Sequence, residues 1–471
     1  MAHLLLAAEG ASPGEAVHPE VTLPVTLLFT ALLVALIACL ALEEKLHAKK
    51  SIIAGLFALL ALFLGVAFHV LPDETHVNSF DEPITLPLYI PGIDWSVIAI
   101  ILGSSLFVDV TSRSGLFTWI AIKVTKTSRG DPLVLLILYG LMTVVFSAVL
   151  NNVTAMIIVG SLTGVSLRKL GREDKLLGFL IVEGLLTNIG GLLTLISSVP
   201  NIIVGTAAEI SFVDFFLKTS PYVLIATVAT LALGAFIFKI RRPAGAEERE
   251  RAAQLVAGFD ENDGVESRGF FWFGSSMTVL FIAVIATTSH LAYIDDLGMG
   301  YVAMGFAAIM LIRFKAVADK FYQAIDWDLL GFFAGLFVVI NVMEHAKVLA
   351  LIGKGLEAII ELPLSSASLL IASAAFSSVT DNIPLAAMLS KILSGLPEKT
   401  AANPGLWWAV VFGANLGGNL TPIGSASTLV AVTIIHKYKL PLSFARFVKI
   451  ALPFALMQIA LATVYVLLFP D

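Results

Sequence analysis

The sequence is dominated by apolar runs of about 20 residues, the length that an α-helix needs to cross a lipid bilayer. These runs begin near residue 22 and recur to residue 469, which leaves room for roughly ten crossings. Of the 471 residues, 58% are hydrophobic and 14% are charged. A soluble protein carries about 25% charged residues. The pattern therefore predicts an all-α polytopic membrane protein and excludes a soluble enzyme.

Charge and cysteine content exclude further classes of protein. The formal net charge of −6 argues against a nucleic-acid partner. The single cysteine, Cys39, lies in an apolar run, which excludes a disulfide framework and a cysteine-based zinc or iron–sulfur site. The sequence contains no GxxxxGK[ST] phosphate loop, which disfavours an ATP-driven pump. We expect no cofactor.

Four apolar runs are longer than one plain crossing requires: 131–165, 176–208, 364–395 and 405–436. Each is interrupted by Asn, Gly, Pro, Ser or Thr. Unwound backbone at membrane depth is tolerated only where it is buried in protein or lines a watery cavity. We therefore expect these runs to contain two re-entrant hairpins and two broken helices that build the functional site.

Lys and Arg mark cytoplasmic loops and so indicate which runs cross the membrane. Basic clusters flank 131–165 at both ends, which predicts an inner hairpin there. The run 364–395 has few basic flanks and is predicted to be an outer hairpin. This arrangement places most Lys and Arg inside, both termini outside, and the hydrophilic stretch 241–268 in the cytoplasm.

The second half of the sequence repeats the first at a nearly constant offset of 227 to 232 residues. The matching stretches are Asp94-Trp95 with Asp326-Trp327, Asn151-Asn152 with Asp381-Asn382, and Asn188-Ile-Gly-Gly191 with Asn415-Leu-Gly-Gly418. The loop charges give the two copies opposite orientations. Inverted repeats with paired broken helices are typical of secondary transporters, which bind substrate near the midplane between the halves.

The repeat divides the chain into six predicted segments. They are an extracytoplasmic N-terminal segment (1–21), a helical pair with an outer loop (22–92), the first repeat (93–240), a cytoplasmic linker (241–268), scaffold helices (269–325) and the second repeat (326–471).

Small and polar residues concentrate at the hairpin tips and in the interrupted crossings, which we expect to converge. Glycine lets backbone approach a ligand closely, and Asn, Ser and Thr supply the neutral oxygens that hard cations prefer. The candidate substrate- and ion-binding residues are Asn151, Asn152, Thr154, Glu183, Asn188, Gly190, Gly191, Thr194, Ser198, Asn201, Thr380, Asp381, Asn382, Asn415, Gly417, Gly418, Thr421 and Ser425. The alternative for any one of them is helix packing, which also uses small polar residues.

Two carboxylates within the apolar runs are the sharpest candidates, because charges at membrane depth are costly and usually functional. Asp381 stands at the predicted tip of the outer hairpin, and Glu183 stands five residues before Asn188. We expect both to carry protons in transport. We also expect a candidate sodium site formed by Asn152, Asn188, Asp381 and Asn415.

At these motifs the sequence resembles the ion transporter superfamily, specifically the ArsB/NhaD permeases with a citrate-transporter-like domain. The resemblance covers roughly 25–469 and rests on Leu150-Asn-Asn-Val-Thr-Ala155, Glu183 with Asn188-Ile-Gly-Gly191, Ser198-Val-Pro-Asn201, Thr380-Asp-Asn-Ile-Pro384 and Asn415-Leu-Gly-Gly418. It implies a homodimer in which the early helices of each repeat form a scaffold. The hairpins and broken helices would form a transport domain that moves in an elevator-like step.

The sequence departs from the pattern of that family at three places. Its sodium/proton antiporters carry an acidic residue where this chain has Asn151, and another near Ser198. Its carboxylate transporters show Ser-Asn-Thr at both tips, and this chain shows it at neither.

The sequence therefore predicts a secondary active transporter of the inner membrane and not an enzyme. The leading hypothesis is cation/proton antiport, with sodium as the cation and the lipid bilayer as surroundings. The alternative is an anion or oxyanion permease for carboxylate or arsenite, with or without sodium coupling. A channel or a non-transporting scaffold is a third reading, which the paired broken helices disfavour.

Overall fold

The computed structural model describes residues 21–71, 76–77, 83–84, 86–87, 89–243, 245–315, 318–323, 325–397 and 403–468. All of the predicted N-terminal segment except residue 21 lies outside this range. Most of the described residues are helical. The strands among them are His76–Val77 (β1) and Pro83–Ile84 (β2), which pair antiparallel. The predicted all-α class is confirmed.

Both halves of the chain contain the same succession of helices. In the first half these are α1 (Leu23–Ala41), α3 (Lys50–Ala67), α4 (Trp95–Ser112), α5 (Leu116–Thr127), α6 (Pro132–Val149), α7 (Asn152–Lys169), α8 (Leu176–Gly190), α9 (Val199–Ala207) and α10 (Phe212–Ile237). In the second half they are α12 (Arg268–Ala286), α13 (Ile294–Arg313), α15 (Trp327–His345), α16 (Val348–Ile360), α17 (Ser365–Ser377), α18 (Asn382–Ser394), α20 (Pro404–Gly417), α21 (Ala426–Lys437) and α22 (Phe444–Leu468). The succession includes two helical pairs, α1 with α3 and α12 with α13, which the sequence analysis left outside the repeats. Short helices α2 (Glu43–Leu46), α11 (Ala246–Ala257) and α14 (Ala318–Tyr322) lie between the others.

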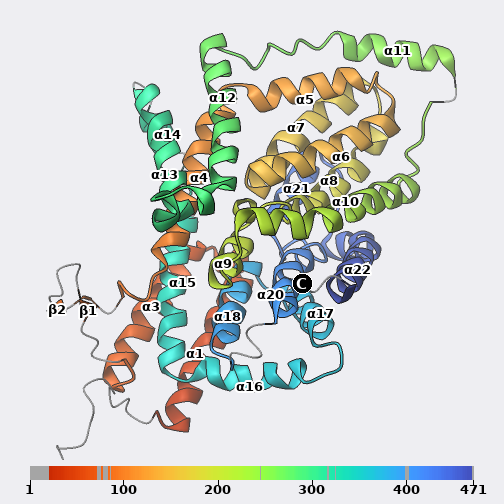
Figure 1. The fold of residues 1–471 in the computed structure, drawn as a ribbon. Helices are drawn as coiled ribbons and strands as arrows, with labels where there is room; N and C mark the ends of the chain where they lie inside the picture. The colour runs from red at the N-terminus through yellow and green to blue at the C-terminus, as the bar shows by residue number, and fades with distance from the viewer. Residues whose placement is uncertain are drawn as a thin grey trace, which may run out of the picture.

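The helices α1, α3, α4, α12, α13 and α15 form one bundle, here called the wall, along the left of Figure 1. In the wall, α4 packs along α13 and α3 packs along α15, so each repeat packs a helix against the other. Two glycines permit this close approach. A Cβ atom at Gly103 would collide with the backbone of Ala303, and one at Gly335 would lie 2.9 Å from the carbonyl carbon of Ala54. Small residues serve this purpose in membrane helices.

The remaining long helices, α6 to α10 and α17 to α22, form a second bundle, here called the core, at the right of Figure 1. Its two halves interlock, since α21 packs on α7 and α8, while α9 packs on α18 and α20. Helices α5 and α16 run across the top and the bottom of the view and connect the wall to the core.

Both runs predicted to be hairpins consist of two helices joined by a short break. Asn151 caps α7 from the position just before it, where its side chain accepts a hydrogen bond from the Thr154 backbone N–H at 2.7 Å. Asp381 caps α18 in the same way, accepting from the Ile383 N–H at 3.1 Å. Such caps satisfy backbone donors that the helix itself leaves free. Pro132 at the start of α6 and Arg172 just after the end of α7 line a common pocket, and the two helices pack on each other, which is the geometry of a hairpin.

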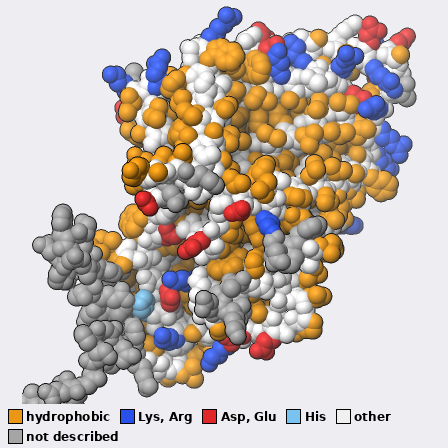
Figure 2. Space-filling model, in the orientation of Figure 1, with side chains coloured by type: hydrophobic (Ala, Val, Ile, Leu, Met, Phe, Trp, Pro, Cys, Tyr) orange, Lys and Arg blue, Asp and Glu red, His pale blue; other side chains and the backbone are white. Residues whose placement is uncertain are grey.

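Nine helices of the described chain are long and apolar enough to cross a membrane, and α6 is one of them. The other eight, with the broken crossings α8–α9 and α20–α21, make up the ten predicted spans. Figure 2 shows hydrophobic side chains over much of the visible face, with Lys and Arg gathered at the upper and right-hand margins. Large contiguous apolar surfaces are rare in soluble monomers. The polytopic membrane fold is confirmed.

Candidate functional site

The two broken crossings end their first helices at equivalent glycines. Helix α8 stops at Gly190 and α20 stops at Gly417. A Cβ atom at Gly190 would lie 2.7 Å from the backbone of Val144 in α6, and one at Gly417 would collide with the backbone of Ala374 in α17. Each hairpin arm therefore passes directly over the end of a broken helix, where only glycine fits.

Beyond the breaks, the chain resumes as a helix at equivalent serines. Ser198 precedes α9 and Ser425 precedes α21, and both have extended backbone. Ser425 caps its helix by accepting from the Thr428 N–H at 3.4 Å. The intervening segments 191–198 and 418–425 are the breaks that the sequence predicts in the apolar runs 176–208 and 405–436.

The predicted pair of asparagines lies in one buried polar core, and each is bound by the opposite repeat. The Oδ1 atom of Asn188 accepts hydrogen bonds from Ser425 at 3.1 Å and from Ser427 at 3.0 Å. In the equivalent contact, Oδ1 of Asn415 accepts from Ser198 at 2.8 Å. Both asparagines are almost fully buried. Each unwound segment thus contacts the end of the broken helix of the opposite repeat, and the asparagine amides there are satisfied by protein partners.

A chain of amides that the sequence analysis missed extends this core. Asn188 donates through Nδ2 to Oδ1 of Asn419 at 2.8 Å, and Asn419 donates to Oε1 of Gln458 at 2.8 Å. Gln458 in turn donates to Thr230 at 3.0 Å. The signals were available, because Asn419 directly follows the repeated motif Asn415-Leu-Gly-Gly418 and Gln458 is an amide in an otherwise apolar span.

Each hairpin is fastened to its broken crossing by the same side-chain bonds. Ser147 of α6 donates to the Thr187 carbonyl at 2.6 Å, and Ser377 of α17 donates to the Ala414 carbonyl at 2.6 Å. The second matched pair is Thr194 donating to the Ala148 carbonyl at 2.6 Å and Thr421 donating to the Ser378 carbonyl at 2.5 Å. All four hydroxyls are buried. Hairpins and crossings are therefore held together as one unit.

The four residues of the candidate sodium site are placed unequally. Asn152 donates weakly to Oδ1 of Asn188 at 3.4 Å, and a Cβ atom at Gly191 would lie 2.6 Å from Oδ1 of Asn152. Asn415 belongs to the other side of the same core, where it also donates to Asn201 at 2.8 Å. The carboxylate of Asp381 turns to a different neighbour.

Asp381 forms an ion pair with Lys50, the first residue of α3 in the wall. The Lys50 ammonium also lies 3.8 Å from Glu43. Next to Lys50, Ser51 donates its hydroxyl to Asp328 at 2.5 Å. The Asp381 side chain is only 15% exposed. A cation from the wall therefore compensates the charge of Asp381. The equivalent Asn151 is exposed and neutral.

Glu183 lies in the middle of α8 and is completely buried. Thr163 of α7 donates its hydroxyl to Oε1 at 2.6 Å, and Oε2 has no hydrogen-bond partner among the described residues. A buried carboxylate is costly as an unpaired ion. Binding of a proton or a cation at Oε2 would remove that cost. Within the part of the chain that the structure describes, Glu183 is thus a buried carboxylate without a salt-bridge partner.

The remaining tip residues have local roles in this arrangement. Thr380 donates its hydroxyl to the Phe376 carbonyl at 2.9 Å, within its own hairpin. Asn382 is buried in the first turn of α18, and the Thr154 N–H is capped by Asn151. Among the residues that the structure describes, no three His, Cys, Asp or Glu side chains are grouped so that they could hold a metal ion.

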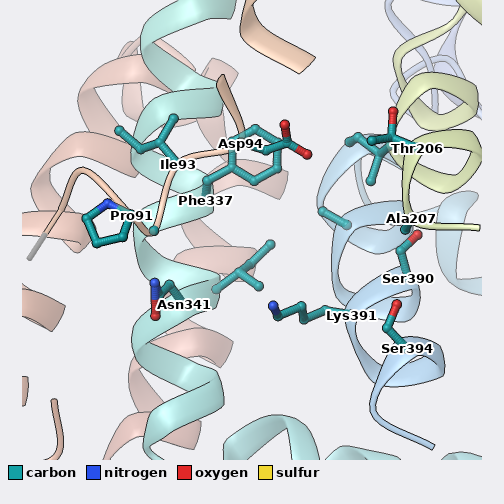
Figure 3. A pocket seen from close by; sticks show the side chains of 14 residues that line it. Pro91, Ile93, Asp94, Thr206, Ala207, Phe337, Asn341, Ser390, Lys391 and Ser394 are labelled. Carbon is teal, nitrogen blue, oxygen red and sulfur yellow. The ribbon is translucent and has the colours of Figure 1, made fainter. Parts of the chain in front are cut away.

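A cavity of about 370 Å³ separates the wall from the core (Figure 3). The segment 91–94 and Asn341 of α15 line one side, and Ser390 and Lys391 of α18 line the other. Figure 3 shows the Lys391 side chain reaching across the gap towards α15, where its ammonium lies 3.0 Å from Glu344. The cavity is thus a gap between the bundles, and the amide core does not line it.

Known proteins resemble the chain in sequence and in fold. It matches the family described as "Citrate transporter" over residues 20–413. It is 31% identical over 385 residues to the 46 kDa membrane protein of Mycobacterium leprae, which covers 79% of this chain and 86% of that protein. It is 30% identical over 379 residues to an uncharacterized transporter of Mycobacterium tuberculosis, with the same coverage. The YdaH transporter of Alcanivorax borkumensis shares the fold, with a TM-score of 0.59 over 90% of this chain and 99% of that chain at 14% identity.

Proposed function

The chain belongs to the citrate transporter family and is a multi-pass inner-membrane transporter rather than an enzyme, and we propose that the transport it performs is an exchange of sodium for protons. The proposal assigns the exchange to the core and its two carboxylates, Glu183 and Asp381. The homodimer and the elevator-like movement that the resemblance implies are part of the same proposal.

The observation that carries this proposal is the state of Glu183. Its carboxylate is fully buried, one oxygen is held by Thr163, and the other has no partner among the described residues. A group of this kind gains most from binding one positive charge at a time, either a proton or a cation. Competition for one carboxylate is the simplest physical basis for exchanging the two.

An elevator-like step is supported by how the bundles are joined. The hairpins are fastened to the broken crossings by buried hydroxyls, so the core can move as a unit. Across the boundary with the wall, the polar contacts include two ion pairs, Lys50 with Asp381 and Lys391 with Glu344. Charged pairs at a partly solvated boundary are easier to exchange than packed apolar contacts.

A second candidate function is a carboxylate permease, which the description of the matching family favours. In that case the cation would be a co-substrate that helps the amides and hydroxyls of the unwound segments bind a small anion. Asp381 would then contribute to the cation site rather than to proton exchange.

Reconstituted proteoliposomes that contain a pH-sensitive dye distinguish these functions. An imposed pH gradient should collapse when sodium is added, with lithium and potassium as comparisons. The Glu183→Gln variant should lose this response, because an amide does not take up a proton there. The matched control, Glu357→Gln, changes an exposed carboxylate of α16 and should behave like the unmodified protein.

Two outcomes would contradict the proposal. Proton movement that responds to citrate and other carboxylates, and not to any of the three cations, would establish the second candidate. Normal sodium-driven exchange by the Glu183→Gln variant would show that Glu183 is not the shared site.

A further inference from the structure

A pocket of about 300 Å³ lies at the base of the first hairpin, formed by α6 and α7. Its lining residues are distant in the sequence from the residues at the hairpin tips. Its basic lining residues come from two segments of the chain, the turn before α8 and the stretch that follows α10. They are Arg172, Lys175, Lys239, Arg241 and Arg242. This side of the molecule is the one that the basic loops mark as cytoplasmic. Five cationic side chains therefore converge on one small space.

Acidic neighbours neutralise only part of this charge. Glu248 of α11 forms an ion pair with Arg172, and Asp174 lies 3.3 Å from the Lys175 ammonium. Arg242 lies 3.6 Å from Asp131, the residue that caps α6. Lys239 and Arg241 have no acidic partner among the described residues. The pocket thus retains a net positive charge.

The start of a helix adds to the positive potential. Lys175, which lines the pocket, ends the short 3-10 turn Glu173–Lys175 that leads directly into α8. The dipole of a helix carries a partial positive charge at its start, which favours a nearby anion. The dipole of α8 and the unpaired basic side chains therefore favour the same kind of ligand.

We propose that this basic pocket binds a phosphate-bearing anion. Phosphate oxygens accept several charge-assisted hydrogen bonds at once, and Arg and Lys are the side chains that usually supply them. The volume is at the lower end of the range for small-molecule sites, which suits a single head group or an inorganic diphosphate. The anion comes either from a phospholipid at the membrane surface or from the cytoplasm.

The pocket also joins the first hairpin to the linker between the repeats. Helix α11 packs on α5 and α7, and its residue Glu248 forms an ion pair with Arg172. A phosphate group in the pocket competes with Glu248 for the same guanidinium. Occupancy therefore weakens the hold of the linker on the hairpin base.

Binding to the full-length purified protein tests the site in two arms. In the first, inorganic diphosphate is titrated into protein in a neutral detergent, with potassium chloride at equal ionic strength as the reference. In the second, protein in phosphatidylcholine nanodiscs is compared with protein in discs that contain phosphatidylglycerol. Thermal unfolding reports binding, because a ligand of the folded state raises the unfolding temperature.

The double variant Lys239→Gln/Arg241→Gln should weaken binding by at least about tenfold in the arm that supplies the ligand, since it removes two charged donors. A matched variant, Lys437→Gln/Lys439→Gln, removes one charge at the end of α21 and one just after it, outside the pocket, and should bind normally. A response in the diphosphate arm identifies a soluble anion, and one in the lipid arm alone identifies a head group. Equal responses of the unmodified protein and the pocket variant, or no response beyond that of potassium chloride, would overturn the proposal.

Discussion

The two halves of the core use the same bonds to hold their backbone but differ in their charges. Ser147 and Ser377 fasten equivalent hairpins to equivalent carbonyls at the same distance of 2.6 Å. Glu183, however, is matched in the second repeat by Val410, which is equally buried. The hydrogen bonds that hold the backbone are thus present in both copies of the repeat, whereas the buried carboxylate of Glu183 is present in the first copy alone.

The hairpin tips show the same contrast from the opposite half. Asp381 in the second repeat is paired with Lys50, and its counterpart Asn151 is a neutral, exposed cap. Each half therefore contributes one carboxylate, in a different place and environment. The repeat thus accounts for the shape of the core, while departures from the repeat account for its two carboxylates, Glu183 and Asp381.

Removing the charge of Asp381 should have the largest effect. The Asp381→Asn variant keeps the cap of α18 but leaves the Lys50 ammonium without its nearest partner, and the loss of such a partly exposed ion pair costs about 1 kcal/mol of stability. Sodium-driven proton exchange should fall to the level of empty liposomes. The double variant Lys50→Met/Asp381→Asn should recover thermal stability without recovering exchange. Wild-type exchange by Asp381→Asn near neutral pH would reduce Asp381 to a structural cap.

Asn188→Ala and Asn415→Ala should each reduce transport strongly, and the first should be the more severe. Asn188 forms hydrogen bonds with Asn419 and with two serines of the other repeat. Its loss therefore leaves more buried polar groups without a partner than the loss of Asn415 does, at a cost of about 1–3 kcal/mol for each unsatisfied group. We expect uptake to fall by about tenfold or more, which corresponds to about 1.4 kcal/mol. Uptake assays at matched protein levels measure this. Normal uptake by both variants would mean that the unwound segments do not contribute to the site.

Ser147→Ala and Ser377→Ala should have smaller and equal effects. Each removes one buried hydroxyl that donates to a carbonyl of a broken helix, a loss of about 1 kcal/mol. Melting temperatures in detergent should therefore drop by similar amounts. A clear difference between the two would show that the symmetry of the bonds does not extend to their energies.

The linker contact through Glu261 should give the smallest effect, because partly exposed ion pairs stabilise little. Lys126 donates to its carboxylate at 2.6 Å, and this hydrogen bond, helped by Lys123, lowers the pKa of Glu261 to about 2. The stabilisation is fully present above the ordinary value of 4.5 and is lost as the pH falls through about 2. Cleavage of the linker by an acid protease should rise across that window. The Glu261→Gln variant should be cleaved readily throughout it, and identical cleavage curves would rule out the contact.

The sequence carries a clear signal for features that depend on local chemistry. The broken helices are predictable because Asn-Gly-Gly cannot continue a helix comfortably and recurs at a fixed offset. The hairpin tips are predictable from Asn151 and Asp381, which are good helix caps within apolar runs. The helical pairs α1–α3 and α12–α13 escape the same reasoning, because lipid-facing apolar residues are interchangeable and preserve no motif.

Features that depend on distant partners are not readable from the chain. Lys50 and Asp381 are 331 residues apart, and nothing local marks Lys50 as more than one basic residue in a loop. The same is true of Glu248, because nothing in the sequence distinguishes it from other charged residues of a polar linker, and only the structure shows its ion pair with Arg172. Both pairings follow from how the bundles pack, which no spacing in the sequence expresses.

The crosswise packing of the wall has a consequence for how the protein is made. Helix α3 leaves the ribosome long before α15. The surface around Ala54 therefore has no contact with Gly335 until the second repeat has been synthesised. At about 5–20 residues per second, that interval is on the order of tens of seconds. During it, the first repeat stands in the bilayer with unmatched helix faces. Biogenesis of this fold therefore requires that lipid or an insertion factor shield those faces until translation is nearly complete.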